Sequence, residues 1–188
     1  MHPIHPEVYA PAEDTVLLKE AALRVLAPGD TVLEIGCGSG EVSEGLAGHA
    51  GLVVATDINP HAVRSAFQRG VAAVRCDLFD GICGRFDLIL CNPPYLPTEE
   101  SDRIDDWLEY ALDGGSDGRE TITRFLAAAP RHLTERGKLL LLVSSLTGID
   151  DVVLLFRENR MIACIVAEAQ LDGERLVVLL GMIDSCSA

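Results

Sequence analysis

The chain has 188 residues, of which 48% are hydrophobic, and this length and composition predict one domain with a full core. Its 29 acidic residues outnumber the 15 basic ones and give a net charge of −14, so the basic surface that direct nucleic-acid binding normally requires is not expected. The sequence shows neither an apolar run of the ~18 residues that a membrane span needs nor a targeting signal, so we expect a cytoplasmic protein.

After a polar N-terminal arm, residues 1–12, the predicted elements alternate between helices and strands. An amphipathic helix follows the arm and ends at Pro28-Gly29. Short apolar segments typical of strands covered on both faces are Thr31–Ile35, Leu52–Thr56, Val71–Arg75, Phe86–Cys91 and Lys138–Val143. The pattern predicts helices at about 40–48, 60–69 and 119–134, and one more after Thr147.

The last two apolar segments, Ile162–Ala167 and Leu176–Leu180, are joined by Asp172-Gly173, which is a tight-turn signal. They are expected to pair as an antiparallel hairpin that closes an otherwise parallel sheet. The whole pattern predicts a doubly wound α/β fold in a single domain, residues 1–188.

The first strand runs into a turn with three alternate glycines, Gly36, Gly38 and Gly40. Such a turn brings backbone N–H groups close to a ligand, although it can also be simply a tight connection. The dinucleotide-binding pattern would need glycine at position 41, where this chain has Glu41. Glu34 precedes the turn, and its charge suits a cationic sulfonium nucleoside better than a pyrophosphate.

The next two predicted strands also end in acidic residues. Asp57 lies about 20 residues after the first glycine, where a carboxylate can accept hydrogen bonds from ribose hydroxyls, or alternatively cap the helix at Pro60. Asp77 and Leu78 follow the third strand and could bind the amino group and the ring of an adenine. Since ligands bind at the carboxyl edge of open parallel sheets, these residues are expected to face one site.

The fourth strand ends in Asn92-Pro93-Pro94-Tyr95, the most specific motif of the chain. The two prolines fix the backbone, so the Asn92 side chain and the Pro93 carbonyl can both accept hydrogen bonds from one planar NH₂ group. Tyr95 supplies a flat face for that group to stack on. Such a clamp aims the nitrogen lone pair at a methyl donor by orientation and fixed dipoles, without a strong base.

These motifs resemble the HemK/PrmC family of protein-glutamine N5-methyltransferases, especially its short archaeal and eukaryotic branch. The resemblance covers about residues 7–181. The segments that carry it are Val8–Thr15, Glu34–Gly40, Asp57–Pro60, Asn92–Tyr95 and Leu112–Glu120.

The resemblance implies a class I S-adenosylmethionine-dependent methyltransferase fold with a seven-stranded, mostly parallel sheet. It implies that S-adenosyl-L-methionine is bound by Thr15, Glu34, Gly36, Gly38, Asp57, Asp77, Leu78 and Asn92. It also implies that Asn92, Pro93 and Tyr95 hold the acceptor, the glutamine of the Gly-Gly-Gln loop of a class I peptide chain release factor.

The chain departs from the longer bacterial members, which carry an additional N-terminal helical substrate domain. Members of the short branch work as heterodimers with a small zinc-binding activator protein, so the resemblance implies such a partner. In this fold the strand Val71–Arg75 lies at an edge of the sheet and lacks a charge or proline over 71–74. Either the chain's own loop near 82–85 or the partner, by strand addition, is expected to cover it.

Other readings remain open. Asn-Pro-Pro-Tyr also occurs in DNA adenine methyltransferases, so an N6-adenine or other exocyclic-amino nucleic-acid methyltransferase is an alternative, which the acidic charge disfavours. Protein lysine methylation and a non-catalytic binding module are weaker alternatives.

The remaining polar features carry less information. An acidic loop, residues 96–118, is expected at the rim of the site, as a substrate contact or as a solvated loop with a short helix near Trp107. The six cysteines lack C-x-x-C spacing, and the five histidines show no pairing that suggests catalysis or metal binding. We therefore predict buried free thiols, surface or capping histidines, and no metal site.

Overall fold

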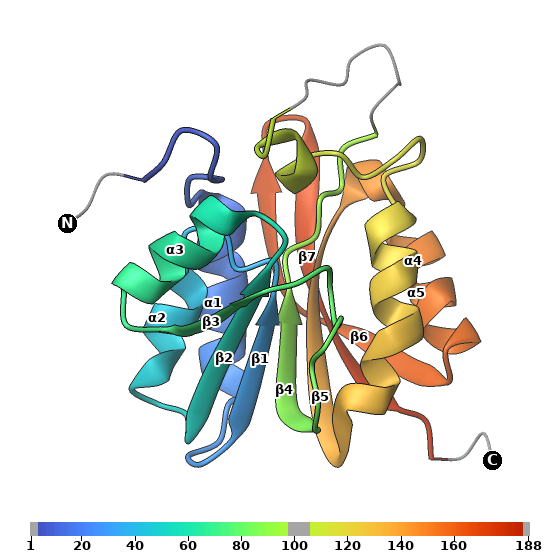
Figure 1. Ribbon diagram of the computed structural model, residues 1–188. Helices are drawn as coiled ribbons and strands as arrows, with labels where there is room; N and C mark the ends of the chain where they lie inside the picture. Colours follow the sequence, from blue (N-terminus) through green and yellow to red (C-terminus); the bar gives the residue numbers. More distant parts are fainter. Residues whose placement is uncertain (1–3, 98–105, 186–188) are drawn as a thin grey trace.

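The computed structural model describes residues 4–97 and 106–185, and a seven-stranded sheet runs through its centre (Figure 1). The strand order is β3-β2-β1-β4-β5-β7-β6. The strands are β1 (Thr31–Ile35), β2 (Leu52–Asp57), β3 (Ala72–Arg75), β4 (Phe86–Cys91), β5 (Leu133–Ser144), β6 (Met161–Leu171) and β7 (Glu174–Ile183). The helices are α1 (Glu13–Val25), α2 (Glu41–Ala47), α3 (Pro60–Gln68), α4 (Glu120–Ala128) and α5 (Ile149–Glu158).

Helices cover both faces of this sheet, α1, α2 and α3 on one side and α4 and α5 on the other (Figure 1). Alternation along each strand explains the two layers, since successive side chains point to opposite faces. On β1, Val32 packs with α1 and α2, whereas Leu33 packs with α4 and α5. Strands buried on both faces explain why their sequences read as continuous apolar runs.

Strands β1 to β5 pair in parallel, and β7 pairs antiparallel with both β5 and β6. This arrangement confirms the predicted class I methyltransferase fold, including the C-terminal antiparallel hairpin. Since consecutive parallel strands place their carboxyl ends at one edge, the segments after β1, β2, β3 and β4 meet there.

The predicted helix at 119–134 is too long. The α-helix ends at Ala128, a 3₁₀ turn covers Ala129–His132, and β5 begins at Leu133. Pro130 explains the early end, because it lacks an N–H group and cannot continue the helical hydrogen bonds. Strand β5 is therefore longer than the predicted 138–143.

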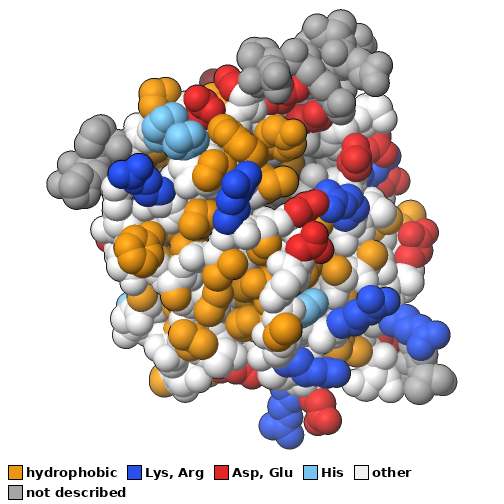
Figure 2. All heavy atoms as spheres, viewed as in Figure 1, with side chains coloured by type: hydrophobic (Ala, Val, Ile, Leu, Met, Phe, Trp, Pro, Cys, Tyr) orange, Lys and Arg blue, Asp and Glu red, His pale blue; other side chains and the backbone are white. Residues whose placement is uncertain are grey.

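Strand β3 lies at an edge of the sheet, as expected, and is largely exposed. Val74 is 47% exposed, and Phe67, at the end of the neighbouring α3, is 72% exposed. Hydrophobic side chains gather on this side of the molecule (Figure 2). The loop residue Ile82 packs against the core on the α4–α5 face of the sheet, yet Val74 stays exposed.

The N-terminal arm crosses the carboxyl edge of the sheet. The side chain of Asn59 donates to the Glu7 carbonyl at 2.8 Å, and the Glu7 carboxylate accepts a hydrogen bond from the Trp107 N–H at 3.3 Å. Val8 is buried, so the arm is part of the packed structure.

None of the helices within 4–97 and 106–185 is long and apolar enough to cross a membrane.

Candidate active site

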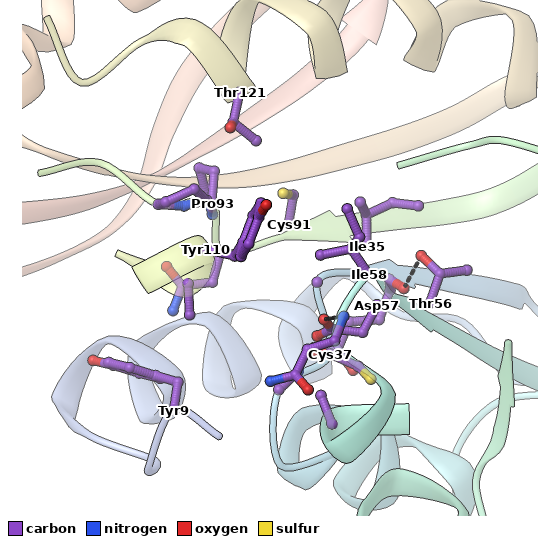
Figure 3. A pocket seen from close by; sticks show the side chains of 18 of the residues that line it. Tyr9, Ile35, Cys37, Thr56, Asp57, Ile58, Cys91, Pro93, Tyr110 and Thr121 are labelled. Carbon is purple, nitrogen blue, oxygen red and sulfur yellow. Dashed lines mark hydrogen bonds between the residues drawn. The ribbon is translucent and has the colours of Figure 1, made fainter. Parts of the chain in front are cut away.

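A cavity of about 300 Å³ lies at the carboxyl edge of β1, β2, β3 and β4. The N-terminal arm and α4 border it. Tyr9 of the arm and Thr121 of α4 approach it from different sides (Figure 3). The residues predicted to bind the cofactor or the acceptor all line it, namely Thr15, Glu34, Gly36, Gly38, Asp57, Asp77, Leu78, Asn92, Pro93 and Tyr95. The sequence thus identified their common location, while their individual roles stay predictions.

The turn after β1 needs its glycines for backbone reasons. Gly36, Gly38 and Gly40 have φ values of 73°, 50° and 82°, in the left-handed region that other residues rarely adopt. A Cβ on Gly40 would lie 2.7 Å from the Cα of Ala66, so this glycine also lets α3 pack closely. The result is an open backbone surface on the cavity side of the turn.

Asp57 holds this turn in place. Its Oδ2 accepts a hydrogen bond from the Gly38 N–H, and its Oδ1 accepts one from the Asn59 N–H, both at 2.9 Å. Burial raises the pKa of Asp57 and these backbone donors lower it. The capping alternative for Asp57 is wrong, because the cap of α3 is Asn59, whose side chain accepts from the His61 N–H at 2.8 Å.

Glu34 is buried, and its Oε2 accepts hydrogen bonds from the N–H and the hydroxyl of Ser43 in α2. Burial raises its pKa to about 8, although the bonds from Ser43 lower it. The carboxyl group is therefore largely protonated at neutral pH in the ligand-free protein. This effect of burial on the pKa of Glu34 differs from the fixed negative charge expected from the sequence.

The carboxylate of Asp77 lies 2.6 Å from Nη2 of Arg124, which α4 places across the cavity. The sequence offered no reason to join these two residues, which are 47 positions apart. Leu78 has a positive φ of 49° and packs against the core cluster below α4. One carboxylate oxygen of Asp77 thus forms an ion pair with the Arg124 guanidinium at the cavity wall.

Asn92 makes one strong contact and leaves one group unpaired. Its amide nitrogen Nδ2 donates to Oδ2 of Asp14 at 2.9 Å. Its amide oxygen Oδ1 is buried and has no hydrogen-bond partner within residues 4–97 and 106–185, although the residue lines the cavity. Because buried polar groups are nearly always paired, this acceptor points to a ligand donor.

Two tyrosine side chains, Tyr95 and Tyr9, also line the cavity. Tyr95 is half-buried, and burial together with the charges of Glu174 and Asp14 raises its pKa to about 12. Its phenol is neutral at physiological pH and presents a flat face. Tyr9 donates its hydroxyl to Asp14 at 2.9 Å, and its pKa is raised by burial and by that carboxylate.

The acidic loop contributes aromatic residues to the cavity. Trp107 and Tyr110 line it, and the 3₁₀ turn Glu109–Ala111 follows Trp107. The described carboxylates mostly hold turns: Asp106, Asp113 and Asp117 each accept a hydrogen bond from a nearby backbone N–H. Four other acidic residues of the loop expected at the rim of the site lie outside the described residues, namely Glu99, Glu100, Asp102 and Asp105.

Several cavity residues were not assigned from the sequence. Tyr9 and Asp14 stood within the Val8–Thr15 motif, which was the available signal, but their contacts depend on the tertiary fold. No sequence signal pointed to Thr121 and Arg124, which reach the cavity from α4.

The expectation of buried free thiols holds for only some of the described cysteines. Cys37 and Cys91 are buried, but Cys83 and Cys164 are exposed. They lie in the loop before β4 and on the edge strand β6. Cys186 lies outside the described residues.

His5 and His61 lie against each other, a contact that the sequence did not predict. Their rings stack in parallel with centroids 3.8 Å apart, and Glu7 brings a carboxylate oxygen within 4.8 Å of their nitrogens. An ion bound by both rings would have to lie near both ring planes, which parallel stacking prevents. The absence of a metal site stays a prediction.

Comparison with known proteins places this geometry in a family. Residues 32–111 match a family model described as a methyltransferase domain. The chain is 40% identical to a putative protein N5-glutamine methyltransferase of Methanocaldococcus jannaschii, over 94% of this chain and 92% of that protein. It is 33% identical to the methyltransferase HEMK2 of Homo sapiens, over 92% of this chain and 88% of that protein.

A solved structure is also similar, the Mtq2–Trm112 complex of E. cuniculi, which is described as responsible for methylating the eRF1 translation termination factor. The similarity has a TM-score of 0.79 and 31% identity, and covers 94% of this chain and 99% of that chain. The sequence motifs, the fold and these relatives agree, and the chain belongs to the HemK/PrmC family of protein-glutamine N5-methyltransferases.

Proposed function

We propose that this chain transfers a methyl group from S-adenosylmethionine to the side-chain amide nitrogen of the glutamine in the Gly-Gly-Gln loop of a peptide chain release factor. The observation that carries the proposal is the unpaired, buried Oδ1 of Asn92 at the cavity. It needs an N–H donor, and a primary amide supplies one. Relatives that act on glutamine, or on a termination factor, support the choice of acceptor.

The residues around the glycine turn fit the cofactor. Asp57 has lone pairs left for ribose hydroxyls after binding two backbone N–H groups. Asp77 has one carboxylate oxygen beyond the contact with Arg124 for an adenine amino group. Thr15, Glu34, Gly36, Gly38 and Leu78 form the remaining wall. When bound, S-adenosylmethionine supplies a methyl group on a cationic sulfur.

The chain's part in the chemistry is to orient the acceptor. Asn92 Oδ1 and the Pro93 carbonyl accept hydrogen bonds from the amide NH₂, while Tyr95 packs on its plane. The nitrogen lone pair is delocalised, so holding both N–H bonds polarises the group and directs it at the methyl carbon. The nitrogen gains the methyl group, the methyl–sulfur bond breaks, and one N–H proton leaves to solvent.

The charge distribution supports a protein acceptor over a nucleic acid. The chain carries a net charge of −14, and acidic residues such as Asp106, Glu109 and Asp117 surround the segment that lines the cavity. The negative charges of these residues would repel a phosphate backbone. A lysine acceptor is less suitable, because a flexible ammonium group does not need a planar clamp.

We also propose a heterodimer with a small zinc-binding activator, paired along β3. Among the described strands β3 pairs with β2 alone, and Val74 on β3 and Phe67 on α3 add exposed apolar area beside its outer edge. Strand addition satisfies such an edge. The similar Mtq2 protein is in a complex with Trm112. Because the proposed substrate acts in translation termination, we propose that the protein works in the cytoplasm.

Labelled methyl transfer tests the proposal. The chain, alone and co-expressed with the activator, is incubated with labelled S-adenosylmethionine and a release factor, and separately with adenine-containing single-stranded DNA. We expect label in the release factor, and none when its Gly-Gly-Gln glutamine is changed to alanine. Equal labelling of the alanine variant, or preferential labelling of DNA, would overturn the assignment.

A further inference from the structure

The Asp14 carboxylate forms a network of hydrogen bonds beside the proposed acceptor clamp. It is 3% exposed and accepts four hydrogen bonds. Oδ2 accepts from the Tyr9 hydroxyl and from Asn92 Nδ2, both at 2.9 Å. Oδ1 accepts from the N–H and the hydroxyl of Thr15, at 2.5 and 3.1 Å. The start of α1 thus meets the end of β4 through one carboxylate.

This contact decides which end of the Asn92 amide faces the cavity. An ionised carboxylate can only accept hydrogen bonds, so it must face the amino end of an amide side chain. The other end, Oδ1, is then directed away from Asp14, and it is the atom that is buried without a partner among the described residues. If the amide rotated by half a turn, two N–H donors would oppose the NH₂ group of the acceptor.

We propose that Asp14 is a positioning residue that sets the polarity of the Asn92 clamp, so that Asn92 presents an acceptor and selects a primary amide nitrogen. The proposal rests on the function proposed above. Asp14 itself does not touch the transferred group, and its effect passes through Asn92. Tyr9 and Thr15 hold the carboxylate in place from two sides.

The variant Asp14→Asn separates polarity from packing, because it keeps the shape of the side chain. The introduced amide has one acceptor oxygen, and two donors from Thr15 compete for it. Its amino group then faces Asn92, which must turn its own oxygen toward position 14. We expect kcat to fall about 10²-fold, the order found when a preorganised polar contact is lost. Affinity for S-adenosylhomocysteine should change much less.

A reciprocal exchange provides the decisive measurement. In Asn92→Asp alone, two carboxylates face each other, and kcat should also fall by about 10². In the double variant Asp14→Asn/Asn92→Asp, the amide at position 14 donates to the carboxylate at position 92. The other oxygen of that carboxylate again points at the acceptor, so kcat should recover at least ~10-fold over the better single variant.

The measurement uses the full chain with its copurified activator, a release factor as acceptor, and separate determination of kcat, KM and S-adenosylhomocysteine affinity. Asp87→Asn is the matched control, since Asp87 accepts hydrogen bonds from Thr31 and Thr134 at the opposite end of the sheet. It should leave kcat unchanged. Unchanged kcat in Asp14→Asn, or additive losses in the double variant, would overturn the proposal.

A wild-type chain that does not methylate glutamine would refute the proposed function instead. The orientation of Asn92 is then read from its side-chain ¹⁵N–¹H₂ signals, assigned by their loss in Asn92→Asp. In the wild type these protons should exchange slowly with solvent, and in Asp14→Asn they should exchange faster because they face the cavity. Equal exchange rates in both proteins would contradict the polarity assignment.

Discussion

At the scale of single residues, the carboxyl groups at the sheet edge already have hydrogen-bond or ion-pair partners within the protein. Asp57 holds two backbone N–H groups, Asp77 contacts Arg124, and Glu34 is bonded to Ser43. Each one therefore shapes the cavity before any ligand binds. Their substitution should affect the site by two routes, lost ligand contacts and a displaced turn.

Asp57→Ala tests both routes. The change removes the proposed contact with ribose and also frees the Gly38 and Asn59 N–H groups. Losing charge-assisted hydrogen bonds should weaken S-adenosylmethionine binding by ~1.5–3 kcal/mol. Calorimetric titration measures this, with Asp87→Ala at the other end of the sheet as control. Unchanged affinity in a folded Asp57→Ala protein would refute the assignment.

Glu34 should make folding stability depend on pH. Its pKa is raised from 4.5 to about 8 in the folded protein, so the folded state favours the protonated form. The stabilisation relative to ionised Glu34 is fully present below pH 4.5 and is lost as pH rises through about 8.

Glu34→Gln removes this dependence, since the amide resembles the protonated acid and does not titrate. The free energy of unfolding of both proteins is measured by urea denaturation between pH 5 and pH 8. Relative to Glu34→Gln, the wild type should lose about 1.4 kcal/mol for each pH unit crossed between the unfolded and the folded pKa of Glu34. A difference between the two proteins that stays constant across this range would show that Glu34 is not buried as described.

At the scale of elements, β3 and β6 both end the sheet, but only β3 lies beside the cavity. Cys76, Asp77 and Leu78 follow β3 directly and line the cavity. A partner bound to β3 would therefore act on residues proposed to hold the adenine. A partner bound to β6 would lack this direct connection.

Val74→Glu on β3 and Ile162→Glu on β6 form a matched pair, because the two side chains are 47% and 51% exposed. A buried, unpaired carboxylate at an interface is costly, so Val74→Glu should abolish copurification with the activator. Ile162→Glu should leave the complex intact, and both proteins should keep the wild-type circular dichroism spectrum. Loss of the complex in Ile162→Glu alone would place the interface at the other edge.

The sequence predicted most elements because strands buried on both faces and amphipathic helices have strong apolar patterns. Its error at 119–134 arose where local helical spacing continued past Pro130 into β5. The site was predicted where residues follow strands directly, as with Asp57 and Asn92. Asp14, Thr121 and Arg124 were not assigned, because helices bring them to the cavity through contacts that no local pattern encodes.

At the scale of the whole molecule, the proposed cofactor wall, the proposed acceptor clamp and the N-terminal arm meet at one edge of the sheet. The arm is fixed by Asn59 and Trp107, and α1 fixes Asn92 through Asp14. These contacts join segments from the beginning, middle and second half of the chain around one cavity. These contacts orient the proposed amide clamp through residues of the described ranges 4–97 and 106–185.

The position of the transferred methyl group tests the central claim most directly. A release factor treated with the chain, its activator and S-adenosylmethionine is digested and fragmented by mass spectrometry. The account predicts one added methyl group on the side-chain amide of the Gly-Gly-Gln glutamine, and its loss with Asn92→Ala. A methyl group on lysine, on the peptide backbone or on another side chain would contradict it.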